Sequence, residues 1–218
     1  MVAAGIPPEF YRDRLAALPT VSPNVPPPVA AEQASRRLVT KVAALQAALD
    51  RDGAWEAALA EDEFNGWLAI DLPRNHALLL PAGWSDPRLA LESGRIRAAA
   101  RKAVLGPLGG IVSLALDVRL RQRNVVECTV ADARLGVIPL PRAAWLHWIA
   151  TRLGPLGLPT EIRRRDGEST LVITLAATDR RQVTLEALAV DARELLMAGT
   201  VTRAARGRDP GGSEAKTQ

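Results

Sequence analysis

Hydrophobic and polar residues alternate along residues 111–122. One face of this stretch is apolar and carries Val112, Leu114, Leu116, Val118 and Leu120. The opposite face is mostly polar and carries Ser113, Asp117, Arg119 and Arg121. A period of two with one apolar face is typical of an antiparallel strand in a sheet that is dry on one side and wet on the other. The pattern predicts such a sheet, with its apolar face shielded from water by helices.

The alternation continues over residues 125–135, after a turn at Arg123-Asn124, and its phase slips near residues 131–132. A slip of one residue predicts a β-bulge at this point. Turn residues and alternation predict three more strand pairs. The first joins residues 88–91 and 95–104 through a turn at Ser93-Gly94, and the second joins residues 161–165 and 169–175 through a turn at Asp166-Gly167. The third joins residues 182–190 and 194–202. A helix over residues 187–197 is the competing interpretation of the last pair. Residues 105–110, rich in glycine and proline, are expected to form a turn.

Helical spacing of apolar residues predicts helices over residues 8–18, 30–50, 61–72 and 142–153. In the third of these, we expect Phe64, Trp67 and Leu68 to form the buried stripe and Pro73 to end the helix. In the fourth, one side carries Trp145, Trp148, Ile149 and Leu153. The predicted fold class is α+β, a curved antiparallel β-sheet packed against an N-terminal amphipathic helix and two shorter helices.

Proline and glycine content divides the chain into three parts. Residues 1–29 are predicted to be a short helix followed by a proline-rich arm, and residues 30–203 a single α+β domain. Residues 204–218 are polar and glycine-rich and are expected to be a disordered tail.

Composition disfavours some classes of protein but does not identify the class to which this chain belongs. The net charge is +4 over 218 residues, and acidic residues are interspersed among the arginines. Basic runs occur at residues 163–165 and 180–181, but no exposed strand aromatics accompany them, which disfavours a nucleic-acid partner. Cys128 is the single cysteine and is expected to be a small core residue. No stretch is long and apolar enough to span a bilayer.

No catalytic or metal-binding pattern can be assembled from the sequence. The two histidines, His76 and His147, have neither the spacing nor the partners of a metal site, and no nucleophile or phosphate-loop motif is present. The acidic residues 61–63 fit a helix N-terminus, where the helix dipole favours negative charge. An enzyme would need a cleft that gathers His147, Asp132 and Glu161. We predict a non-enzymatic protein without a cofactor or a metal.

Two segments resemble a known group of proteins. Residues 61–68 (EDEFNGWL) resemble the Glu-x-Glu-hydrophobic-Asn-x-hydrophobic-Leu helix of an uncharacterised bacterial envelope family, and residues 136–141 (GVIPLP) resemble its Gly-x-hydrophobic-Pro-hydrophobic-Pro strand end. The similarity covers roughly residues 30–202. Those proteins are N-terminally anchored α+β domains, and some are similar to tubular lipid-binding proteins. The resemblance implies a bacterial envelope location, a membrane-proximal position if an anchor precedes the chain, no catalytic residues, and a structural role for Asn65.

The leading functional hypothesis is an envelope-associated domain that binds a lipid or another apolar ligand in a sheet–helix cavity. The residues predicted to contact the ligand are Leu114, Leu116, Val118, Val126, Val130, Trp145 and Trp148. Trp84 and Trp145 are candidates for a partly exposed lip, whereas core packing is expected for Trp67 and Trp148. The alternative is a scaffold domain that binds another protein through its surface and its proline-rich arm.

Overall fold

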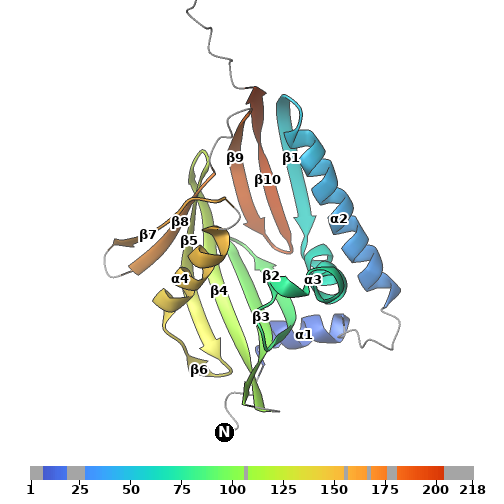
Figure 1. The fold of residues 1–218 in the computed structure, drawn as a ribbon, viewed down its shortest axis with the longest axis vertical. Coiled ribbons are helices and arrows are strands. Elements are labelled where there is room, and N and C mark those ends of the chain that lie inside the picture. Colours follow the sequence, from blue (N-terminus) through green and yellow to red (C-terminus); the bar gives the residue numbers. More distant parts are fainter. Residues whose placement is uncertain are drawn as a thin grey trace, which may run out of the picture.

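A computed structural model describes residues 7–18, 28–105, 108–154, 157–165, 168–175 and 181–203. Most of the predicted proline-rich arm and the whole predicted tail lie outside these residues. The described helices are α1 (Glu9–Ala17), α2 (Val29–Leu49), α3 (Glu61–Asn75) and α4 (Arg142–Leu153), and a short 3-10 helix, η2, follows α3 at Ala77–Leu79. Each predicted helix is present (Figure 1).

The described strands form two antiparallel sheets, so the predicted α+β class is confirmed. The small sheet has the order β1-β10-β9, and the large one has the order β2-β3-β4-β5-β8-β7, with β6 paired to β5 (Figure 1). The strands of the small sheet are β1 (Gly53–Ala60), β9 (Arg181–Asp191) and β10 (Glu194–Arg203). Those of the large sheet are β2 (Trp84–Glu92), β3 (Arg95–Leu105), β4 (Leu108–Gln122), β5 (Val125–Leu135), β6 (Ile138–Pro139), β7 (Thr160–Arg165) and β8 (Glu168–Thr174).

Strand register confirms two details of the sequence analysis and rejects one alternative. Ala115 lies opposite Asp132 and Leu116 opposite Val130, so Ala131 is the extra residue of a bulge. Residues 181–191 and 194–203 pair as strands, and the competing helix over 187–197 is wrong. Strand pairing prevails there because it satisfies the backbone along both β1 and β9.

Helices cover both faces of the large sheet. Leu146 of α4 is buried in a core with Val126, Cys128 and Leu171, on the face that the alternation marks as apolar. On the opposite face, α1 buries Phe10 and Tyr11 against Ala90 of β2, Ala99 of β3 and Ile111 of β4. The sheet face that the alternation predicts to be exposed to solvent is therefore covered by α1 at one end, and Ser113 is buried there. The alternation of polar and apolar residues does not predict this second core, because most of the sheet residues in it are alanines.

Helix α3 is held against the edge strand β2 by its own polar side chains. The Asn65 Nδ2 atom donates to the Leu89 carbonyl at 2.8 Å and the Glu61 carbonyl at 3.0 Å, and its Oδ1 atom accepts from the Leu89 N–H at 2.9 Å. The Leu91 N–H donates to the Glu61 carboxylate at 2.7 Å. These bonds satisfy an exposed sheet edge that would otherwise be open to pairing. The expected structural role of Asn65 is confirmed.

The buried face of α3 differs from the predicted one. Phe64, Trp67 and Leu68 are only partly buried, whereas Ala69, Ile70 and Leu72 are buried with the polar residues described above. Trp67 instead stacks beside His76, with 5.5 Å between ring centroids. The expected core position of Trp67 is wrong, because hydrogen bonds to β2 and close packing on α2 fix which side of α3 turns inward.

Pro73 does not end α3, which continues to Asn75. Pro73 lacks the N–H that would donate to the carbonyl four residues earlier, so its inclusion costs the helix one hydrogen bond, and any kink affects only the last turn. The His76 N–H donates to the Leu72 carbonyl at 3.1 Å and closes the helix.

Close approach of α2 and α3 depends on Gly66. A Cβ at this position would lie 2.7 Å from the Ala34 Cβ, 2.8 Å from the Ser35 nitrogen and 2.9 Å from the Ala31 oxygen. Two of these atoms belong to the backbone and cannot rotate away. The two helices are also joined by a hydrogen bond between the Ser35 hydroxyl and the Asp71 carboxylate.

We predict that Gly66→Ala lowers the free energy of unfolding by about 1–3 kcal/mol, the usual cost of overpacking a tight contact. Alanine has the better helix propensity, so a loss of stability would report the contact and not the helix. Chemical denaturation followed by circular dichroism measures the effect. Arg74→Ala, on the exposed side of the same helix, serves as the control and should change stability by less than about 0.5 kcal/mol. Equal stability of both variants would contradict the close contact.

Tyr11 gives a second prediction because it is the one tyrosine of the chain. Its side chain is fully buried, and its hydroxyl donates to the Asp86 carbonyl at 2.9 Å. Burial, followed by the charge of Asp86, raises the pKa of the phenol from 10.0 to about 12. The stability gained by keeping the neutral phenol buried is therefore complete below pH 10 and is lost as the pH rises from 10 toward 12.

Absorbance of the phenolate near 295 nm follows this titration without interference from another tyrosine. The native protein should titrate about two pH units above the urea-unfolded protein. Coincident curves would show that α1 does not bury Tyr11.

Candidate functional site

Three tryptophan rings from two elements meet at one edge of the large sheet. Trp84 begins β2, and Trp145 and Trp148 lie on α4. Ring centroids are 6.3 Å apart for Trp84 and Trp145, 6.4 Å for Trp84 and Trp148, and 5.7 Å for Trp145 and Trp148. The rings border an open cavity of about 510 Å³, which we call the tryptophan cavity. Its lining is Pro81, Ala82, Trp84, Lys102, Leu140, Pro141, Ala144, Trp145 and Trp148.

The lining of this cavity combines apolar surface with one positive charge. The Lys102 Nζ atom lies 5.2 Å from the Trp84 ring centroid, and the Arg152 guanidinium lies 5.4 Å from that of Trp148. Among the lining residues Lys102 is the cation, and none is a carboxylate. Cations near the face of an indole ring are attracted to its electrons. The cavity therefore suits an apolar group that carries, or ends beside, a negative charge.

A β-bulge places Trp84 in the cavity. Arg88 lies opposite Ala99 and Ser85 opposite Arg101, so Asp86 and Pro87 face a single residue of β3. Asp86 has a positive φ of 53°, a strained value for a residue other than glycine. A slip of one residue moves the side chains beyond it to the other face of the sheet. Trp84, which precedes the bulge, therefore lies opposite Lys102, on the sheet face that α4 covers. Without the bulge it would point toward the α1 side.

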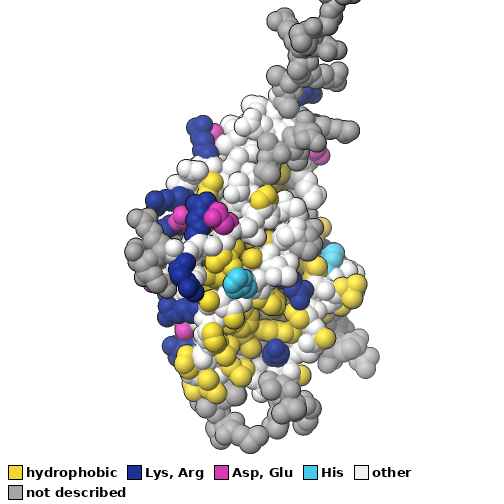
Figure 2. Space-filling view, turned by 60° about the vertical axis from the view of Figure 1, so that its left-hand side comes forward, with side chains coloured by type: hydrophobic (Ala, Val, Ile, Leu, Met, Phe, Trp, Pro, Cys, Tyr) yellow, Lys and Arg dark blue, Asp and Glu magenta, His cyan; other side chains and the backbone are white. Residues whose placement is uncertain are grey.

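Beyond the tryptophan cavity, past the buried Ala100 and Val112, the same face of the sheet carries a row of apolar residues. Register places Lys102, Ala98 and Ile96 on one face of β3, with Leu114 and Leu116 opposite the last two on β4. Leu89 lies opposite Ala98 on β2. All five apolar residues are only partly buried, although they belong to the interior face. We call them the apolar strip; Figure 2 shows hydrophobic side chains gathered over the lower half of this side of the molecule.

The structure brings together most of the residues predicted to contact a ligand. Leu114, Leu116 and Val118 follow one another along the interior face of β4, partly buried, and Trp145 packs beside them in the same core. Val126 and Val130 share that face but are buried in the core with Leu146, so a ligand at the surface could not reach them.

Trp148 is 41% exposed, and its expected core position is wrong. Leu146 instead supplies the buried side of α4, because the helix contacts β5, β7 and β8 through that side. Trp84 and Trp145 are both partly buried at the lip of a cavity, as expected for them. Lys102 does not stand out in the sequence, because it meets Trp84 only through the bulge in β2, which turns Trp84 to the face of the sheet that carries Lys102.

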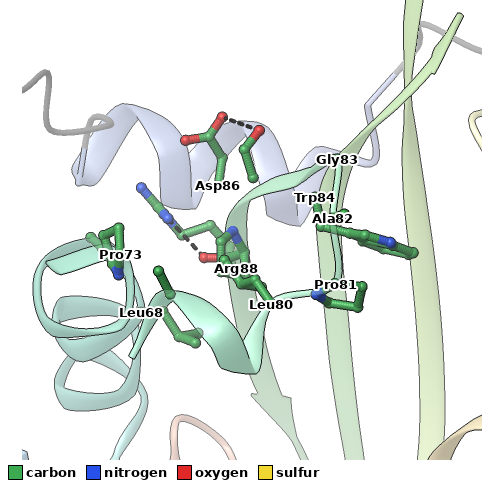
Figure 3. Close-up of a pocket in the computed structure, with 13 residues that line it drawn as sticks. Leu68, Pro73, Leu80, Pro81, Ala82, Gly83, Trp84, Asp86 and Arg88 are labelled. Atoms are coloured by element: carbon green, nitrogen blue, oxygen red, sulfur yellow. Dashed lines mark hydrogen bonds between the residues drawn. The ribbon is translucent and has the colours of Figure 1, made fainter. Parts of the chain in front are cut away.

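A second cavity of about 400 Å³ lies on the other side of the Pro81–Trp84 segment, between α3 and β2 (Figure 3). Its one cation, Arg88, is buried and donates to the Pro87 and Leu18 carbonyls, at 2.7 Å each. Burial lowers the pKa of this guanidinium, and the charge of Asp86 opposes that effect. Because Leu18 is the C-cap residue of α1, Arg88 places a positive charge at the C-terminus of that helix and is committed to the fold.

The three residues that a catalytic cleft was expected to gather, His147, Asp132 and Glu161, have other partners. Asp132 pairs with Arg134 at 2.7 Å, and Glu161 pairs with Arg163 at 2.8 Å, a contact that lowers the pKa of Glu161. Within the described part of the chain, no hydrogen bond joins either carboxylate to the side chain of His147, and no cluster of three metal-ligating side chains occurs. No helix among the described residues is long and apolar enough to cross a membrane.

No family model matches the chain, and no curated protein or solved structure is significantly similar to it.

Cys128 provides a test of the core beneath the apolar face. The thiol is buried, and burial raises its pKa to about 11. Since the thiolate is the reactive form, we predict that native protein does not react with Ellman's reagent at pH 8 over many minutes. Protein in guanidinium chloride should release one equivalent of chromophore, since the chain has one cysteine. Rapid reaction of the native protein would show that β5 is open to solvent.

Proposed function

We propose that the protein is a non-enzymatic domain that binds a lipid or another apolar ligand along the apolar strip, with the tryptophan cavity as its entrance. The observation that carries this proposal is the partial exposure of an interior sheet face. Apolar residues that face a core are normally covered, and an exposed apolar patch commonly marks a binding surface.

The dimensions and chemistry of the site support this proposal. A cavity of about 510 Å³ lies within the usual range for small-molecule sites. Its walls are aromatic and aliphatic, and Lys102 offers one charge with which to orient an amphiphile such as a fatty acid. An acyl chain could extend from the cavity over Ala98 and Leu114, which lie opposite each other on β3 and β4.

A second candidate function is binding of another protein through α2. Val39 and Val42 are exposed on α2, and Leu196 is exposed on β10. A groove of about 730 Å³ lies between these elements and is lined mostly by alanine. A stable protein partner that co-purifies without lipid would favour this function.

Two measurements test the proposed function. Mass spectrometry of an organic extract should detect a bound lipid in the purified protein, and a fluorescent fatty acid should gain intensity when the delipidated protein is added. Ala98→Trp should weaken fatty-acid binding about tenfold. The new ring would cover roughly 60 Å² of the strip, and at about 25 cal/mol per Å² this costs about 1.5 kcal/mol of binding.

Ala58→Trp is the matched control. It adds the same ring at an exposed position of the small sheet and should bind the fatty acid like the wild type. Absence of lipid in the extract together with no fluorescence gain would refute the proposal.

A further inference from the structure

We propose that the rim of the tryptophan cavity docks on the surface of an anionic lipid bilayer. The bilayer would supply the lipid that the apolar strip binds, and this part of the inference rests on the proposed function. Docking itself depends on other residues, which lie outside the apolar strip.

Large hydrophobic side chains stand exposed on both chain segments that lead into the cavity. Leu78 and Leu79 of η2 are 98% and 60% exposed, and the chain then runs into Pro81 and Ala82 of the lining. Val137 and Ile138 are each 47% exposed and lie just before Leu140 and Pro141 of the lining. Together with Trp148 of the lining, these residues form what we call the docking rim: Leu78, Leu79, Val137, Ile138 and Trp148.

The charges beside the docking rim favour an anionic surface. Lys102 lies in the cavity, Arg142 follows Pro141 at the start of α4, and Arg152 lies over Trp148. In Figure 2, dark blue side chains interrupt the hydrophobic area, and magenta ones lie at its margin. Lysine and arginine near a membrane surface are attracted to anionic headgroups, and tryptophan is favoured at the interface because its ring is apolar and its N–H is polar.

The shape of the docking rim favours a bilayer over a folded protein partner. Leu78 is almost completely exposed on a one-turn helix, so its side chain projects from the surface and does not line a groove. Projecting aliphatic groups separated by cations fit a deformable medium, in which apolar tips enter the interface while charges stay at the headgroups.

Sedimentation with vesicles tests the inference. Protein should sediment with vesicles of phosphatidylglycerol mixed into phosphatidylcholine and much less with pure phosphatidylcholine. The double variant Leu78→Ser/Leu79→Ser should lose most of this binding. Lys102→Glu should weaken it at least about fivefold, the equivalent of about 1 kcal/mol for one basic residue at an anionic surface.

Val29→Ser is the control, because Val29 is an exposed apolar residue at the start of α2 and belongs to neither site, and this variant should sediment like the wild type. Absence of wild-type binding to anionic vesicles, or equal binding by the Leu78/Leu79 variant, overturns the inference. Uptake of a soluble fluorescent fatty acid separates the two proposals. Wild-type protein that takes up the fatty acid but does not sediment with vesicles refutes docking and leaves ligand binding standing, and wild-type protein that sediments without uptake does the reverse. The Leu78/Leu79 variant should keep its fatty-acid uptake, which shows that its loss of sedimentation is not a loss of the fold.

Discussion

The arrangement of this protein depends on one buried carboxylate. Glu61 is 1% exposed, and it accepts a hydrogen bond from the Leu91 N–H of β2 while its other oxygen lies 2.5 Å from the Arg14 Nε atom of α1. Its own N–H donates to the Arg193 carbonyl in the β9–β10 turn. Four elements therefore meet at one residue. A buried charge is tolerated only when such partners surround it, and removal of a partner from a buried ion pair typically costs about 3–5 kcal/mol.

This junction decides which part of the large sheet stays open. Since Glu61 and Asn65 hold α3 against the edge of β2, α3 does not lie across the sheet face. Helix α4 covers the opposite end of the same face, over β5, β7 and β8. The strip between them keeps apolar residues partly exposed, and this exposure supports the proposed ligand site.

Polar side chains in the described core serve the fold. The Glu63 carboxylate accepts from the Ala60 N–H and from Lys41 of α2, both at 2.9 Å, so it caps α3 and joins it to α2. The Asn124 amide bonds the Val183 carbonyl and the Leu185 N–H, and in this way fastens the β4–β5 turn to β9. Because these groups already have partners, the open surface that is left near α4 is mainly apolar.

The sequence by itself determined most of the secondary structure, because each strand and helix has its own period and its own turn residues. The alternation over residues 111–135 predicts β4, β5 and the bulge at Ala131, since a phase slip is visible within one chain segment. The structural role of Asn65 was implied by the resemblance alone, and its bonds to β2 show that role. The apolar side of β4, with Leu114 and Leu116, also follows from the alternation alone.

Only the tertiary structure decided which residues form the candidate site. Trp84 reaches Trp145 and Trp148 because a bulge at Asp86 turns it to the α4 side, and no local pattern shows how a hairpin register will slip. Trp148 is exposed and Leu146 is buried because α4 packs on β5, which precedes it in the chain, and on β7 and β8, which follow it. Which side of a helix is covered, and which sheet face stays open, depends on contacts between distant segments. Hydrophobic periodicity describes each segment alone and contains no information about those contacts.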